Sequence, residues 1–67
     1  MNIKTIATNN RVSERLIHYI IAGDRHTTIP FLAIDIATLT GKKPLDYIRP
    51  ERRILFKRIM PELNRRP

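Results

Sequence analysis

The sequence predicts a small all-α protein, a bundle of about four to five short helices, and three observations support this fold class. Apolar residues in each longer segment recur at the three- and four-residue spacing of a helix face. Glycine follows two of these segments, at Gly23 and Gly41, and proline opens two, at Pro30 and Pro50. With 67 residues, we expect a single domain over residues 1–63 and a basic tail over residues 64–67.

The first helix is expected over residues 2–9, where Asn2 can accept hydrogen bonds from the unpaired backbone N–H groups. Its apolar residues share one face: Ile3, Ile6 and Ala7. Asn9 and Asn10 then form a turn, because asparagine tolerates left-handed backbone better than most residues.

The second helix is expected over residues 13–22, with Ser13 as its N-cap and Gly23 as its end. Its apolar stripe is Val12, Leu16, Ile17, Ile20 and Ile21. The start and outer face hold Glu14, Arg15, His18 and Tyr19. A short helix with polar and basic side chains at its exposed beginning has the shape that reads a DNA groove.

Two helices joined by such a short turn indicate a helix-turn-helix motif. The small residue needed where the helices cross is Ala7, and the inward apolar residues are Ile6, Val12, Ile17 and Ile20. The turn departs from the usual pattern, because Asn10 stands at an ordinarily apolar place and Arg11 at the usual glycine. A plain helical hairpin in a small bundle is the alternative.

A polar loop, residues 24–28, separates the second and third helices. Its side chains Arg25, His26, Thr27 and Thr28 can donate to phosphate oxygens. Alternatively, Thr27 or Thr28 caps the next helix, and both interpretations can hold together.

The third helix is expected over residues 30–40, opened by Pro30 and ended by Gly41. Apolar residues occupy most of its circumference: Phe31, Leu32, Ile34, Ile36 and Leu39. A helix that is apolar nearly all round is buried, so it should form the core. Its one charged residue, Asp35, is expected to face outward or to be paired.

The last third of the chain predicts a helical turn and a basic helix. Residues 44–48 form the turn, with Leu45 and Ile48 directed inward, and the helix covers residues 51–60 until Pro61 stops it. Its apolar side is Ile54, Leu55, Ile59 and Met60. Its other side is Arg52, Arg53, Lys57 and Arg58.

The charge balance favours an anionic partner. Thirteen Lys and Arg residues against six Asp and Glu give a formal charge of +7, and residues 35–67 carry +5 of it. Such an excess on a small domain most often indicates nucleic acid, although some basic proteins are merely soluble. Because the core is small and cysteine is absent, we also expect a homodimer through residues 51–63.

Several other classes are not expected. The six carboxylates are scattered, so we predict no enzyme, no catalytic residue and no small-molecule substrate. His18 and His26 have no thiol to join them, so we predict no metal and no cofactor. Apolar runs stay below the roughly 18 residues that cross a bilayer, and no signal-peptide layout opens the chain. We therefore predict no membrane partner and a cytoplasmic location.

Two stretches, IKTIATNNRVSERLIHYIIAGDR and IPFLAIDIATLTGKKPLDYIRPE, carry a family resemblance. Their order of features resembles the phage repressor family of Cro and CI type, including short Cro-like regulators of the YdaS kind. The second stretch is the more specific, through its A-x-x-I-A-x-x-T-G pattern and its close at Ile48, Arg49, Pro50 and Glu51. Two departures are the altered turn and the lack of a helix before Ile3. The resemblance implies a lambda-repressor-like helix-turn-helix bundle.

The resemblance also implies a transcriptional regulator that binds operator DNA as a dimer, with residues 13–22 in the major groove. The implied base contacts are Glu14, Arg15, His18 and Tyr19. The expected backbone contacts are Lys4, Asn9, Asn10, Arg11, Ser13, Arg25, His26 and Thr27. Arg15 suits guanine O6 and N7, and Glu14 could accept from cytosine N4. Alternatively, Glu14 only complements the helix dipole and Tyr19 packs against the core.

Two other functions fit the residues less closely. One is a phage-type protein that binds and inhibits a host or phage protein, an antirepressor or inhibitor on a helix-turn-helix-derived scaffold; the altered turn favours it. The other is a membrane-surface or RNA binder that uses the basic helix of residues 51–60.

Overall fold

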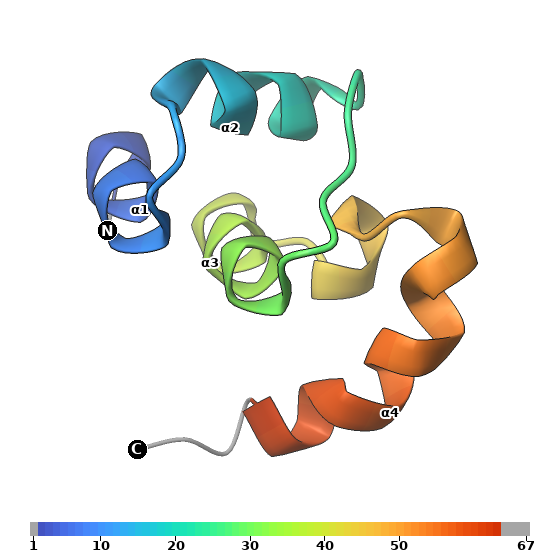
Figure 1. The fold of residues 1–67 in the computed structure, drawn as a ribbon. Coiled ribbons are helices and arrows are strands. Elements are labelled where there is room, and N and C mark those ends of the chain that lie inside the picture. The colour runs from blue at the N-terminus through green and yellow to red at the C-terminus, as the bar shows by residue number, and fades with distance from the viewer. Residues whose placement is uncertain (1, 64–67) are drawn as a thin grey trace.

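The computed structural model describes the backbone of residues 2–63 and, except at positions 60, 62 and 63, their side chains. The elements are α1 (Ile3–Asn10), α2 (Glu14–Ala22), α3 (Pro30–Thr40), two 3-10 turns η1 (Pro44–Tyr47) and η2 (Pro50–Arg52), and α4 (Arg53–Leu63). The fold is all-α, as the sequence predicts. In Figure 1, α1 and α2 lie on one side of α3, and the chain after α3 leads round to α4. The predicted tail, residues 64–67, lies outside the described residues.

Helix α1 is capped as predicted but ends one residue later. Asn2 accepts a hydrogen bond from the Thr5 N–H at 2.8 Å. The prediction that Asn9 and Asn10 form the turn is wrong, because both belong to α1. The Asn10 amide donates to the Ile6 carbonyl at 2.9 Å and to the Asp35 carboxylate at 3.0 Å, which fixes it against α3.

The turn after α1 is made by Arg11 in left-handed backbone. Its φ is 56°, and its N–H donates toward the carbonyls of Ala7 and Thr8. This is the place where the motif usually has glycine, since a side chain makes this conformation costly. Three residues, Arg11 to Ser13, thus join α1 to α2, a length typical of a helix-turn-helix.

Helix α2 begins and ends where its capping residues predict. The Ser13 hydroxyl accepts from the Leu16 N–H at 3.1 Å. Gly23 has a φ of 88°, and its N–H donates to the Ile20 carbonyl at 3.1 Å. Ala7 is buried, consistent with a close approach of α1 and α2.

Helix α3 is the centre of the core, but only one of its faces is covered. Leu32, Ala33, Ile36 and Ala37 are buried, whereas Phe31 and Leu39 are more than one third exposed. The prediction of a helix buried nearly all round is therefore wrong in extent. A domain this small has too few elements to surround a central helix.

The largest fully buried side chains come from α1, α2, α3 and the residue that follows η1: Ile6, Ile17, Ile20, Leu32, Ile36 and Ile48. Each contributes roughly 1.5–3 kcal/mol by leaving water. Ile48 is directed inward as predicted and Leu45 is half-buried. Tyr47, which the pattern did not single out, is also buried, and its hydroxyl lies 2.7 Å from that of Thr40.

A short parallel bridge between Thr27 and Ile48 ties the loop before α3 to the segment after η1. The Thr27 N–H donates to the Tyr47 carbonyl at 2.8 Å, and the Arg49 N–H donates to the Thr27 carbonyl at 3.2 Å. The Thr27 hydroxyl accepts from the Ile29 N–H at 3.0 Å. Neither threonine is the N-cap of α3. That position belongs to Ile29, which makes no side-chain cap.

Helix α4 differs from its prediction at its start, its end and its face. It begins at Arg53 instead of residue 51, because Pro50–Arg52 form the 3-10 turn η2. It runs past Pro61 to Leu63, so Pro61 does not stop it; the missing proline N–H removes only one bond close to the helix end. Among the α4 side chains that the structure describes, Phe56 is the buried one, whereas Ile54 is 77% exposed and Leu55 50%. The predicted apolar side, including Ile59, therefore faces largely away from the core, and the Met60 side chain lies outside those described.

Replacing Arg11 by glycine should stabilise the fold. Arg11→Gly relieves the left-handed strain of a residue with a side chain, and we expect a gain of about 0.5–1 kcal/mol in the free energy of unfolding. Urea unfolding followed by circular dichroism measures it. The matched control is Gly41→Ala at a φ of 75°, where nothing lies within 4 Å of the added Cβ, so strain alone should destabilise the fold. An unfolding midpoint for Arg11→Gly at or below that of the wild type would show that Arg11 is not strained.

The orientation of α4 can be tested with two truncations on the same helix. Phe56→Ala should lower the free energy of unfolding by about 3 kcal/mol or abolish cooperative unfolding, because the ring packs against the core. Ile54→Ala should change it by less than about 0.5 kcal/mol. Equal losses in thermal or urea unfolding would show that the exposed and buried sides are assigned wrongly.

Candidate nucleic-acid interface

Helix α2 presents the four predicted base-contacting residues on the side away from the core. Ile17 and Ile20 are 0% and 1% exposed. The exposed residues of the helix include Glu14, Arg15, His18 and Tyr19. The separation follows from the helical period, since residues three or four apart share a face. Tyr19 is 41% exposed, so its ring is not part of the core.

The end of α2 places Arg25 beside Tyr19. After Gly23 the chain turns back, and the N–H groups of Asp24 and Arg25 both donate to the Tyr19 carbonyl, at 3.0 and 3.3 Å. The Arg25 guanidinium carbon lies 5.6 Å from the centroid of the Tyr19 ring. Such a cation–π contact stabilises by about 0.5–1 kcal/mol at an exposed site. Arg25 is thereby held next to the helix.

The predicted backbone contacts divide into accessible and inaccessible residues. The accessible ones are Lys4, Asn9, Arg11, Ser13, Arg25 and His26. Asn10 must be removed from the set, because both hydrogens of its amide are directed at Ile6 and Asp35. Thr27 must be removed as well, because it is 6% exposed and its hydroxyl is bound to Ile29.

Lys4 and Asn9 do not share one face of α1. They are five residues apart in this helix, which separates them by about 140° around its axis. A single DNA duplex lying against one side of α1 therefore cannot contact the side chains of both Lys4 and Asn9 in the same manner. The accessible cations nearest to α2 in the chain are Arg11, at the turn before it, and Arg25, at the loop after it.

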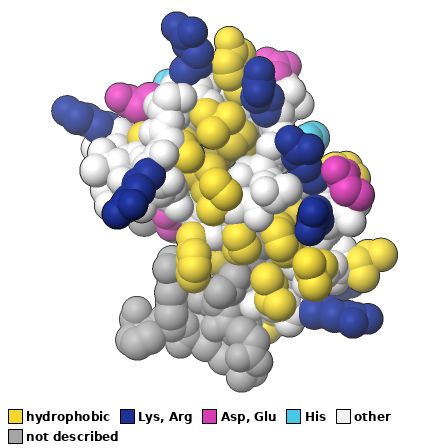
Figure 2. Space-filling model, viewed as in Figure 1, with side chains coloured by type: hydrophobic (Ala, Val, Ile, Leu, Met, Phe, Trp, Pro, Cys, Tyr) yellow, Lys and Arg dark blue, Asp and Glu magenta, His cyan; other side chains and the backbone are white. Residues whose placement is uncertain are grey.

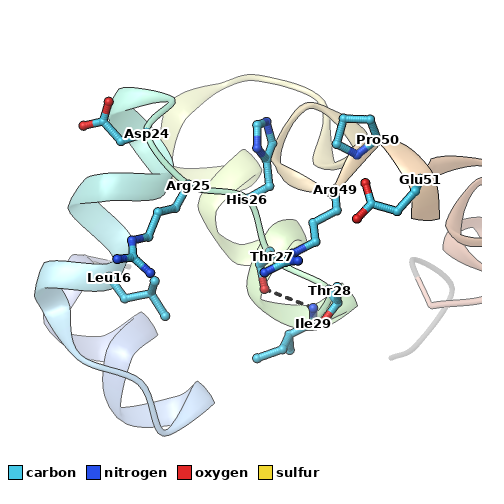
Figure 3. Close-up of a pocket in the computed structure, with 10 residues that line it drawn as sticks. All are labelled: Leu16, Asp24, Arg25, His26, Thr27, Thr28, Ile29, Arg49, Pro50 and Glu51. Atoms are coloured by element: carbon cyan, nitrogen blue, oxygen red, sulfur yellow. Dashed lines mark hydrogen bonds between the residues drawn. The ribbon is translucent and has the colours of Figure 1, made fainter.

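Two neighbouring hollows extend from this face of α2. The smaller, about 290 Å³, is lined by Ser13, Arg15 and Tyr19 together with Leu16 and Arg25. The larger, an open groove of about 550 Å³, shares Leu16 and Arg25 with it. Its lining extends through the loop before α3 to Arg49, Pro50 and Glu51 (Figure 3).

Arg49 is the residue of this surface that sequence reasoning did not include. It lies 24 positions after Arg25, in the close of the stretch that carries the family resemblance, where no DNA contact is predicted. The Thr27–Ile48 bridge brings it beside the loop. No periodicity signals an isolated bridge of this kind, so the sequence offered no indication of it.

Comparison of the chain with protein-family models, curated proteins and solved structures finds no match. Among the residues that the structure describes, no three His, Cys, Asp or Glu side chains come together in a way that could hold a metal ion. Within the same range, each helix is too short or too polar to span a bilayer. Functional assignment therefore depends on the geometry of α2 and its surroundings.

Proposed function

We propose that the protein is a sequence-specific DNA-binding transcriptional regulator, a repressor of the Cro-like phage or prophage type, with α2 in the major groove. The observation that carries the proposal is the division of α2 into a buried and an exposed side. Ile17 and Ile20 anchor the helix, while Arg15 is exposed in its first turn and His18 at its middle. A recognition helix works in this way, with its N-terminal residues contacting base edges.

Each exposed side chain has a chemical role in this proposal. Arg15 would bind guanine O6 and N7 with two donors, and Glu14 would accept from cytosine N4. His18 and Tyr19 would contact bases or phosphates. Arg11 and Arg25, at the two ends of α2, would bind phosphates and fix the register on the duplex. The formal charge of +7 supports the electrostatic part of binding.

Substitution of Arg15 should separate base reading from general attraction. On a site selected from a random duplex library, Arg15→Ala should weaken binding by roughly 1–3 kcal/mol and blur the preference at one base pair. The matched control is Lys57→Ala on α4, an exposed residue whose loss should weaken all sequences alike. Gel shifts across the library measure both. If the wild type binds the selected site no more tightly than random DNA, the proposed function is refuted.

We further propose a homodimer formed through α4. Ile54, Leu55 and Ile59 leave apolar surface uncovered on this helix, and Figure 2 shows hydrophobic side chains gathered over it. A two-fold contact would place the same apolar residues of two copies together. It would also add buried surface to a core that is small for a stable domain. Two copies of α2 would then address two half-sites of one operator.

Placing a charge at the centre of this surface should separate the copies. Ile54→Asp should raise the dimer dissociation constant at least tenfold, because pairing would bury an unpaired carboxylate. Sedimentation velocity over a concentration series measures it. Thr38→Asp is the matched control, since it changes the charge by the same amount at an exposed position on α3. A wild type that stays monomeric at the concentrations where it binds DNA would contradict the dimer.

The uncovered apolar residues of α4 also favour a second candidate, a protein that binds and inhibits a host or phage protein. In that case the apolar surface would contact the partner protein instead of a second copy. Gel shifts on the selected site distinguish the two candidates, because an inhibitor of this kind needs no preference for any duplex sequence.

A further inference from the structure

We infer that the groove between the loop before α3 and residues 49–51 binds a phosphodiester of the duplex beside the segment read by α2, with Arg49 as its anion-binding side chain. This inference rests on the proposed function and extends it. Arg49 lies outside the two helices of the helix-turn-helix pattern and was not among the predicted DNA contacts.

The position of Arg49 is fixed by the backbone on both sides of it. Its own N–H donates to the Thr27 carbonyl at 3.2 Å, and the preceding residue, Ile48, is fully buried. Thr27 is in turn bound to the Tyr47 carbonyl at 2.8 Å. The backbone of Arg49 is therefore held by hydrogen bonds next to the core, whereas its side chain is exposed. Figure 3 shows it extending into the groove alongside Thr27.

The guanidinium of Arg49 is available to an anion. In the part of the chain that the structure describes, it has no hydrogen-bond or ion-pair partner. Arg25 lies on the other side of the same loop in Figure 3, held by the Tyr19 ring. Two guanidinium groups on either side of one loop match the spaced negative charges of a nucleic-acid strand, and planar Arg donors suit phosphate oxygens.

The groove adjoins the surface of α2. Leu16 and Arg25 line both hollows, so the smaller one beside Arg15 neighbours the larger one that reaches Arg49. A strand whose bases are read by Arg15 can thus continue past Arg25 toward Arg49. The contact at Arg49 would fix register without reading sequence.

Two carboxylates also line the groove and bear on its affinity for an anion. Asp24 points away from the groove in Figure 3, whereas Glu51 is directed toward the Arg49 side. Glu51 would repel a phosphate bound at Arg49. Removal of its charge should therefore strengthen binding, an effect that loss of folding cannot imitate.

The test compares three variants of the full chain on the selected duplex by fluorescence anisotropy. Arg49→Ala should weaken binding about fivefold near 0.1 M salt. It should also reduce the magnitude of the negative slope of the logarithm of the binding constant against the logarithm of salt concentration by about one. Glu51→Gln should tighten binding about twofold or more. Arg52→Ala, an exposed arginine outside the groove lining, should change the affinity less than Arg49→Ala. An Arg49→Ala affinity equal to that of the wild type, or weaker binding by Glu51→Gln, would overturn the inference.

A scan of neutral methylphosphonates along the duplex identifies the phosphate. At one position outside the bases read by α2, neutralisation should weaken the wild type and have no further effect on Arg49→Ala. Additive losses at every position would overturn the inference. Inorganic phosphate at constant ionic strength is the second arm. If it binds the wild type saturably, loses this binding in Arg49→Ala and leaves DNA bound, the groove is a site for free phosphate, and the assignment to a strand is wrong.

The Arg15 experiment tests the proposed function, and the Arg49 experiment tests the groove contact. If Arg15→Ala blurs the base preference while Arg49→Ala leaves affinity and salt slope unchanged, the groove contact is refuted and the proposed function stands. If the wild type shows no preference for the selected duplex, the proposed function fails first, and the groove contact fails with it.

Discussion

The one-sided burial of α3 is the constraint on which the rest of the structure depends. Leu32 and Ile36 are fully buried on this helix. Against them pack Ile6 from α1, Ile17 from α2 and Ile48 from the segment after η1. Because each of these elements is too short to be stable alone, its orientation is determined by the apolar residues it contributes to this contact.

The exposed surface of α2 is a direct consequence of that packing. Ile17 and Ile20 point at α3, and the helical period then directs Arg15 and His18 away from it. The segment that carries Arg49 is joined to the loop before α3 by the bridge between Thr27 and Ile48. Since Ile48 is itself a core residue, Arg25 and Arg49 are positioned by the same apolar contact that positions α2. A change in the core would therefore move the cations on both sides of the loop together.

The elements that the sequence predicts well are those whose ends are determined locally. Ser13 and Gly23 cap α2 through hydrogen bonds within one helical turn, and a pattern of single residues reveals them. The features that it does not predict depend on distant partners. Asn10, the last residue of α1, donates its amide to Asp35, 25 positions later, a contact that no local pattern reveals. Phe56 is buried in α4 whereas Ile54 is exposed, and hydrophobicity alone does not distinguish these two residues.

The turn between α1 and α2 shows where local preference and the proposed function diverge. Glycine would adopt the φ of 56° at Arg11 without side-chain strain. Arginine raises the free energy of the folded state there, yet it places a guanidinium at the start of the helix that would enter the groove. Residues that violate a local rule tend to occur at functional sites, where the interaction they make offsets the strain. A phosphate contact by Arg11 would supply such an interaction. The proposed function thus gives a physical reason for the residue that fits the turn least well.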